Sequence, residues 1–480
     1  MTSFPKESSA TRPWLVFAIA GAGIFLATSG ISVVNVALPF ITRDFHADIS
    51  TAQWILLVYL LTTSTLLINF GRLGDLLGSY RVHNFGLFLF TLFSFLCSLS
   101  TSVGMLLGFR TLQAVGGAMV IANGPATVTS VFPADQRGRV LGLQITLLGI
   151  ALSAGPTIGG LLIGAFGWRS VFLYNVPFGL GGLLLTRFVK IAPQERKKIQ
   201  VDLPGSILLF LSIGSFVLAT NRAREWGWSA PSALLLLAVF LISAPAFLIT
   251  EMLSSRPMLD LRLFRNRVFA LAQGGNFIAH LSTFGVIFLM PFYLVHILKV
   301  SAQVSGLLLL PLTIVMIVLG PVSGFLSDYL GTKWLSVLGM GLLCLGLYSL
   351  TSLNESSSIL GIILRLALLG GGRAIYGSPN QSATMGSVSR ERLGVAGGIF
   401  ATMRHLGNIS GLALSGSYFG ARLAFHQQQQ GPAALGQGMT ESSFLPAFHD
   451  TFYLCLWIAS AGLLAALFQK EIDGHAVIRR

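Results

Sequence analysis

The chain has 480 residues, of which 53% are hydrophobic and only 10% are charged, and its formal net charge is +14. A soluble domain carries about 25% charged residues because water must solvate its surface. This composition therefore excludes a soluble protein and calls for a lipid bilayer around most of the chain. The positive charge gathers in alternate short loops rather than in one basic patch, so nucleic acid is not an expected partner.

Hydrophobic segments recur from one end to the other, each close to the ~20 residues that cross the hydrocarbon core as a helix. They are continuous rather than alternating, which excludes a β-barrel. Most of the 31 Lys and Arg lie at the termini or in every second loop, so both termini are expected in the cytoplasm and the number of spans is expected to be even. The predicted spans are 14–38, 51–70, 82–101, 104–131, 139–163, 168–189, 203–221, 231–251, 268–297, 303–327, 334–353, 358–386, 393–421 and 447–469.

One short motif, G-x-L-x-D-x-x-G followed by a cation, occurs after the second span and again after the tenth. Glycine allows a tight turn, and a carboxylate between cations can form an ion pair that breaks when the conformation changes. We expect a cytoplasmic latch at each copy. The latch residues are Gly71, Asp75, Gly78, Arg81, Arg139, Asp328 and Lys333. The repeat predicts two six-helix halves, 1–189 and 253–480, joined by residues 190–252, which hold a linker and two extra helices.

The fourth span contains Arg110 and Gln113, which lie three residues apart and so share one helix face. A buried arginine in a span is costly and usually functional, which makes this pair a candidate functional site. The alternative is that Arg110 lies near the helix end and extends to the headgroups.

The fifth span contains Gly155, Pro156, Gly159 and Gly160. Small residues allow two helices to approach closely, and a proline removes one helical hydrogen bond. We interpret this segment as a hinge; a generic helix-packing face is the alternative.

These elements resemble motifs A, B and C of the major facilitator superfamily, and the resemblance to motif B implies that Arg110 and Gln113 form a coupling site. The run from Trp168 to Gly179 resembles the sequence after motif C in the fourteen-helix drug:proton antiporter family that includes EmrB and QacA. The resemblance implies an all-α membrane protein with a major facilitator fold, two six-helix bundles and two additional helices, fourteen spans in all. It also implies a transporter in the bacterial inner membrane, and no enzymatic activity or cofactor is expected.

One departure from that family lies in the first span. The family's first helix usually reads L-D-x-T-x-V-N-V-A-L-P, but here Gly30 occupies the acidic position and Ser32 the threonine position, while Asn35 matches. The acid is generally taken as a proton or cation site in related exporters. None of the 17 Asp and Glu residues lies in the middle of a predicted span.

Cationic and amide side chains, by contrast, do lie within predicted spans. The candidate cavity residues are Asn35, Asn123, His280, Arg373, Arg404 and His405. Desolvating a cationic substrate without a counter-charge is costly, so this set favours neutral or anionic amphiphiles. The alternatives are that the arginines bond to helix carbonyls or headgroups and that His280 is a packing residue.

We therefore expect a secondary transporter that exports amphiphilic molecules by alternating access, with proton coupling left open. One alternative is a flippase or facilitator for lipids or anionic amphiphiles without the usual coupling, and another is a non-transporting membrane sensor. The expected partners are the substrate and membrane lipids, joined by protons if transport is proton-coupled, and the chain is expected to be a monomer. Its three cysteines are isolated in hydrophobic runs, so neither a disulfide nor a metal site is expected.

Overall fold

The computed structural model describes residues 13–133, 137–189, 203–226, 230–254, 261–388, 393–430 and 441–469, which form helices and connecting turns without any strand. The linker 190–202 lies outside these residues. The first group of helices comprises α1 (Pro13–Phe45), α2 (Ile49–Leu77), α3 (Ser79–Ser98), α4 (Val103–Thr129), α5 (Arg137–Phe166), α6 (Ser170–Leu173) and α7 (Asn175–Leu185), with the short η1 (Thr186–Phe188).

A helical hairpin and a second large group follow. The hairpin consists of α8 (Leu203–Trp226) and α9 (Pro231–Leu253), and the short η2 (Leu261–Arg265) comes after it. The second group comprises α10 (Arg267–Phe292), the π-helical η3 (Tyr293–Ile297), α11 (Ala302–Leu308), α12 (Leu310–Leu330), α13 (Thr332–Leu350), α14 (Ile359–Gly386), α15 (Leu393–Gln429) and α16 (Glu441–Leu467). Within the described residues, ten helices are long and apolar enough to cross a membrane, judged by length and composition.

Local sequence explains where many of these helices begin and turn. The helices α2, α4, α10, α11 and α14 each begin after a polar residue whose side chain accepts a hydrogen bond from the first turn. Gly78 between α2 and α3 has a φ of +96°, and Gly331 between α12 and α13 has a φ of +81°. Only glycine adopts such angles without strain, so the two copies of the repeated motif make tight turns at corresponding positions.

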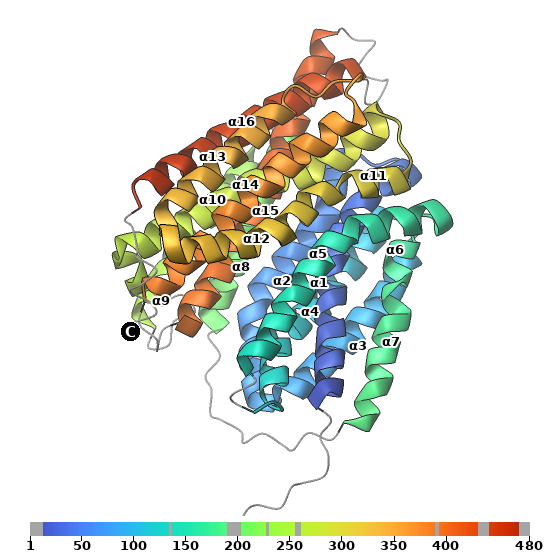
Figure 1. Cartoon of the computed structure of the whole chain (residues 1–480). Coiled ribbons are helices and arrows are strands. Elements are labelled where there is room, and N and C mark those ends of the chain that lie inside the picture. The colour runs from blue at the N-terminus through green and yellow to red at the C-terminus, as the bar shows by residue number, and fades with distance from the viewer. Residues whose placement is uncertain are drawn as a thin grey trace, which may run out of the picture.

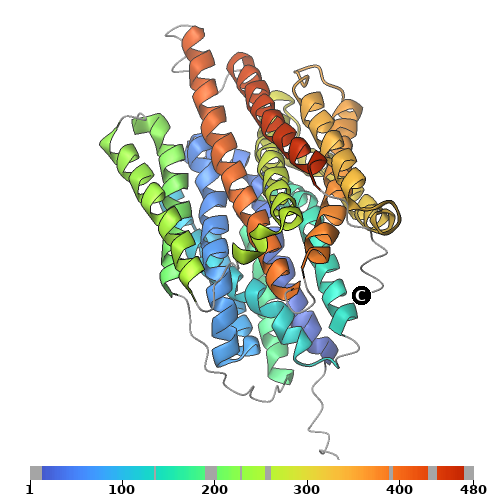
Figure 2. The ribbon, with the colours of Figure 1, turned by 90° about the vertical axis from the view of Figure 1, so that its left-hand side faces the viewer.

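The first and second groups lie side by side, as the blue-to-green and yellow-to-red ribbons of Figure 1 show. Figure 2 shows the α8–α9 hairpin at one side of the bundle, where α8 packs against α2 and α15. The hairpin therefore touches one helix of each group. We call the two ends of the bundle the Pro13 end and the Phe45 end, after the residues at which α1 begins and ends.

Several helices extend beyond the spans predicted from hydropathy. Helix α1 continues to Phe45 rather than ending near residue 38. Its last turns contain polar residues such as Asp44, which a hydropathy pattern does not count as part of a span. The predicted loop 422–446 is also partly helical, since α15 reaches Gln429 and α16 begins at Glu441. Asp450, expected in a loop or at a span end, lies ten residues into α16 and pairs with Arg422 at 2.6 Å.

Contacts between the two groups lie nearer the Phe45 end than the Pro13 end. A Cβ built at Gly160 of α5 would be 2.5 Å from the carbonyl oxygen of Ala302 in α11, so these backbones touch directly. Gln53 of α2 donates a hydrogen bond to the carbonyl of Leu412 in α15. These contacts hold the groups together on one side of the cavity described next.

Candidate substrate cavity

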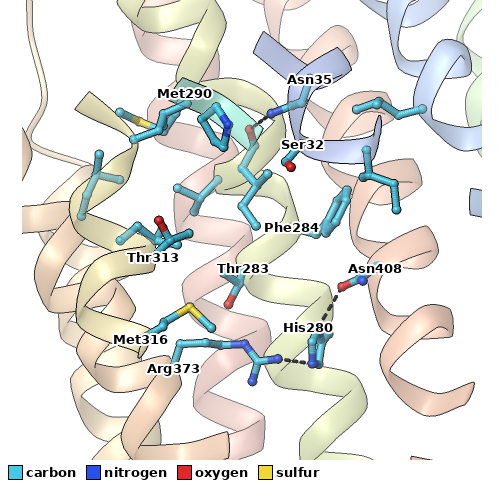
Figure 3. A pocket seen from close by; sticks show the side chains of 18 residues that line it. Ser32, Asn35, His280, Thr283, Phe284, Met290, Thr313, Met316, Arg373 and Asn408 are labelled. Carbon is cyan, nitrogen blue, oxygen red and sulfur yellow. Dashed lines mark hydrogen bonds between the residues drawn. The ribbon is translucent and has the colours of Figure 1, made fainter. Parts of the chain in front are cut away.

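A cavity of about 170 Å³ lies between the two groups of helices. Residues of α1, α2 and α5 line one side, and residues of α10, α12, α14 and α15 line the other. Most lining side chains are apolar, and none of those described is acidic. The polar lining residues are Ser32, Asn35, His280, Thr283, Thr313, Arg373 and Asn408 (Figure 3).

One end of the cavity carries positive charge. Arg373 of α14, only 8% exposed, donates a hydrogen bond to Nε2 of His280 in α10. His280 Nδ1 lies 2.9 Å from the amide oxygen of Asn408 in α15. The two contacts join three helices of the second group, and Figure 3 shows them at the opposite end of the cavity from Asn35. We call Arg373, His280 and Asn408 the cationic end.

Two further basic side chains of α15, Arg404 and His405, lie near the cationic end. Arg404 lies one helical turn before Asn408 on α15 and interacts electrostatically with both His280 and Arg373. Nδ1 of His405 is buried without a hydrogen-bond partner among the described residues. Neither Arg404 nor His405 lines the cavity itself. No described carboxylate interacts with His280 or Arg373, so the positive charge here has no acidic counterpart in the described part of the chain.

The opposite end of the cavity is uncharged. Asn35 of α1 donates a 2.5 Å hydrogen bond to the carbonyl oxygen of Ile287 in α10. That carbonyl is free because Pro291, four residues later, has no N–H to offer it. The bond therefore joins the two groups of helices at the cavity wall (Figure 3).

Arg110 lies outside the cavity, fully buried within the first group. Its Nη2 donates to the carbonyl of Gly30 at 2.9 Å, and its Nη1 donates to Oε1 of Gln113 at 2.6 Å. Its guanidinium carbon also lies 4.1 Å above the ring of Tyr59. Backbone, amide and aromatic groups thus surround the buried charge, and the arginine does not extend to a helix end.

Asn123 does not line the cavity. Its amide nitrogen donates to the carbonyls of Phe70 in α2 and Met119 in α4, at 2.9 and 3.0 Å. A Cβ at Gly74 would be 1.6 Å from its side-chain oxygen, so glycine is required beside it. Asn123 therefore ties α2 to α4 just before the turn at Gly78.

The structure describes the side chains of only some of the latch residues. The side chains of Asp75, Arg139 and Asp328 lie outside those that the structure describes. Arg81 is exposed, and Lys333 Nζ lies 5.4 Å from the ring of Trp334. A Cβ at Gly71 would meet no atom within 4 Å, so close packing does not require glycine at that position. Whether the latches form ion pairs stays a prediction.

The glycines of α5 serve two different helix contacts. Gly155 and Gly159 face α1, where an added Cβ would lie 1.9 Å from Ser32 Oγ and 2.9 Å from the carbonyl oxygen of Val33. Gly160 faces α11, and Pro156 presents its carbonyl oxygen to Gly306 of the same helix. One face of this segment of α5 thus packs against α1 in the first group, and the adjacent face packs against α11 in the second group.

The predicted cavity set omitted four polar lining residues, Ser32, Thr283, Thr313 and Asn408, and sequence spacing could have revealed two of them. Asn408 lies four residues after Arg404, and Thr283 lies three residues after His280, so each shares a helix face with a selected residue. In the described part of the chain, no group of three or more His, Cys, Asp or Glu side chains could hold a metal ion.

The chain is similar to proteins of known type. Residues 20–412 match the model of the Major Facilitator Superfamily. The chain is 29% identical over 469 residues to the riboflavin transporter RibZ of Clostridioides difficile, and the match covers 96% of this chain and 99% of RibZ. It is 32% identical over 412 residues to the multidrug resistance protein Stp of Mycobacterium tuberculosis (85% of this chain, 76% of Stp). It is 31% identical over 420 residues to the tetracenomycin C resistance and export protein of Streptomyces glaucescens (87% of this chain, 78% of that protein).

A solved structure shows the same fold. The chain superposes on a bacterial homologue of the human lysosomal transporter Spinster, inward-facing and unoccupied, with a TM-score of 0.71, 15% identity and 98% of both chains covered. Such low identity supports the fold alone. The family match and the transporter relatives, together with the bundle of apolar helices, lead to one conclusion: the chain belongs to the Major Facilitator Superfamily and is a membrane transporter rather than an enzyme.

Proposed function

We propose that this chain exports amphiphilic small molecules, neutral or anionic, by alternating access. The observation that carries the proposal is the cavity between the two groups, which is apolar along most of its wall and positively charged at one end. An apolar wall takes the hydrophobic part of a substrate, and Arg373 offers donors to an anionic or polar head. A cationic substrate would meet like charge there and no described carboxylate.

The proposed membrane arrangement has fourteen spans, as in the fourteen-helix antiporter family. On this reading α6, α7 and η1 form one span, and α11 with α12 forms another. Residues 1–189 and 253–480 are the two moving halves, and 190–252 contain the additional pair. Both termini would face the cytoplasm of a bacterial cell, which places the Phe45 end at the outer surface.

Alternating access requires the contacts at the Phe45 end to separate when the cavity opens to that side. The meeting of Gly160 with Ala302 supports this role, because two backbones without intervening side chains can part without disentangling them. The latch residues, including Asp75 and Arg81, would close the Pro13 end in the other state. Pro156 would act as the hinge of α5, and Arg110 with Gln113 would take part in coupling.

A second candidate is a facilitator or flippase that lacks the usual proton exchange. Gly30 favours it, since the position that is acidic in related exporters has no side chain, and its carbonyl instead accepts a hydrogen bond from Arg110. The names of the relatives offer no support for a non-transporting sensor. The riboflavin transporter among them suggests aromatic amphiphiles as the first compounds to try.

The test is a binding comparison with three probes that share one ring system: naphthylacetate, naphthylacetamide and naphthylethylammonium. Purified protein should bind the anion and the amide at least about tenfold more tightly than the cation. A hydrogen bond to a charged group contributes about 1.5–3 kcal/mol, and 1.4 kcal/mol is tenfold in affinity. Arg373→Gln should therefore lower the affinity for the anion about tenfold or more and leave the affinity for the amide unchanged.

Arg365→Gln is the matched control, because Arg365 lies on the same helix but donates to the carbonyl of Ser349 and does not line the cavity. This variant should keep all three affinities. Tighter binding of the cation than of the anion, with no effect of Arg373→Gln, would overturn the proposal.

A further inference from the structure

The hydrogen bonds around His280 define its protonation state. A guanidinium only donates, so Nε2 of His280 must accept from Arg373 and cannot carry a proton. Nδ1 then carries the single ring proton and donates to the amide oxygen of Asn408 at 2.9 Å. The imidazole is neutral, and both of its nitrogens are engaged.

The groups around His280 oppose a second proton on its ring. The described charged or titratable groups that act on it electrostatically are Arg373 of α14 and Arg404 and His405 of α15. Helices α1 and α16 also pack against α10 but contribute none of them. A like charge close to a site disfavours its charged form, and no described carboxylate compensates here.

We infer that an anionic amphiphile and a proton bind to this transporter together, with His280 as the group that takes up the proton. The inference rests on the proposed function, because it requires the acidic group of the substrate to bind at the cationic end. An anion that engages Arg373 withdraws the donor from Nε2 and offsets the positive charge nearby. Nε2 is then free to accept a proton from solvent, forming an imidazolium beside the bound anion.

The sign of this linkage distinguishes the site from that of a proton exchanger. In an exchanger, substrate and proton displace one another, as expected where a carboxylate binds either a cation or a proton. Here each favours the other, so the anion and the proton cross the membrane in the same direction. The pair has no net charge, so export through this site follows the outward concentration gradient of the anion and is opposed by an inward proton gradient.

The experiment measures protons taken up from a weakly buffered solution when naphthylacetate binds to the full-length protein near pH 8. The wild type should take up close to one proton per bound anion, whereas binding of naphthylacetamide should take up none. His280→Gln should still bind the anion but take up no proton. His449→Gln is the matched control and should behave as the wild type, since His449 of α16 contacts the carbonyl of Leu353 and neither lines the cavity nor acts on His280.

A second measurement uses the wild type alone and so does not depend on how the variants fold. Affinity for naphthylacetate should fall with rising pH, approaching tenfold per pH unit, while affinity for the amide should stay constant. Anion binding without proton uptake, or uptake that persists in His280→Gln, would overturn the inference and leave the proposed function intact. A wild type that does not bind the anion at all would instead contradict the proposed function.

Discussion

Arg110 donates a 2.9 Å hydrogen bond to the backbone carbonyl of Gly30, the residue at the position that is usually acidic in the antiporter family that this sequence resembles. The buried guanidinium is therefore held by a carbonyl, an amide and the face of Tyr59. A second buried arginine, Arg373, is held by a histidine in the other half. Both groups of helices thus contain a buried cation without a described acidic partner.

Gly30→Asp should be tolerated. A Cβ at position 30 would lie 3.8 Å from Phe90 and 3.9 Å from Nη1 of Arg110, which are ordinary contacts. The new carboxylate would be within reach of the buried guanidinium and would give it the acidic partner that the described residues do not supply. Thermal unfolding of the purified protein should therefore occur at or above the wild-type temperature.

The control for that substitution is Gly116→Ala, where the added Cβ would lie 2.5 Å from the backbone nitrogen of Phe90. Overpacking of this kind costs about 1–3 kcal/mol, so its unfolding temperature should fall. If Gly30→Asp unfolds as early as Gly116→Ala, the space and the pairing described beside Arg110 are wrong.

Arg110→Lys should lower stability more than Arg110→Met. Lysine keeps the buried charge but lacks the planar fork that reaches Gly30 and Gln113 while stacking on Tyr59. Methionine removes the charge and fills similar space, and an apolar replacement of a buried ion can be neutral. The unfolding temperatures of the two variants test this order of stability. Arg81→Lys, which changes an exposed arginine, is the control. A lysine variant as stable as the wild type would mean that the guanidinium geometry is not required.

Gly306→Val should disturb closure of the Phe45 end. Its Cβ would be 2.2 Å from the carbonyl oxygen of Pro156, and a backbone atom cannot move aside as a flexible side chain can. Gly341→Val is the control, because a Cβ there meets nothing within 4 Å. A single cysteine at Ser32, in a variant without the three native cysteines, reports access to the cavity through its reaction with an impermeant maleimide.

Labelling from the Phe45 side should rise several-fold in Gly306→Val and stay at the parental level in Gly341→Val. Equal labelling in both variants would show that the contact between α5 and α11 does not close this side of the cavity.

Sequence spacing predicted contacts within single helices well and contacts between helices poorly. The three-residue spacing of Arg110 and Gln113 leads directly to their 2.6 Å hydrogen bond. The repeated glycine motif likewise leads to the turns at Gly78 and Gly331. The partner of Asn35 could not be predicted, since it is the carbonyl of Ile287, more than two hundred residues away, freed by Pro291.

Helix ends were the other weak point. Hydropathy ends a span at the last apolar residue, but hydrogen bonding and ion pairing continue α15 beyond it. Arg422 and His426 of α15 both contact Asp450 of α16, at 2.6 and 2.8 Å. These polar contacts stabilise helical turns that an apolar pattern does not reveal.

Transport by the purified protein in lipid vesicles tests the central claim most directly. Vesicles loaded with unlabelled naphthylacetate should accumulate the labelled anion by exchange through the wild type. The same assay should show transport of the amide and little transport of the ammonium compound. Arg373→Gln should lose transport of the anion and keep that of the amide. Preferential transport of naphthylethylammonium, unaffected by Arg373→Gln, would contradict the account.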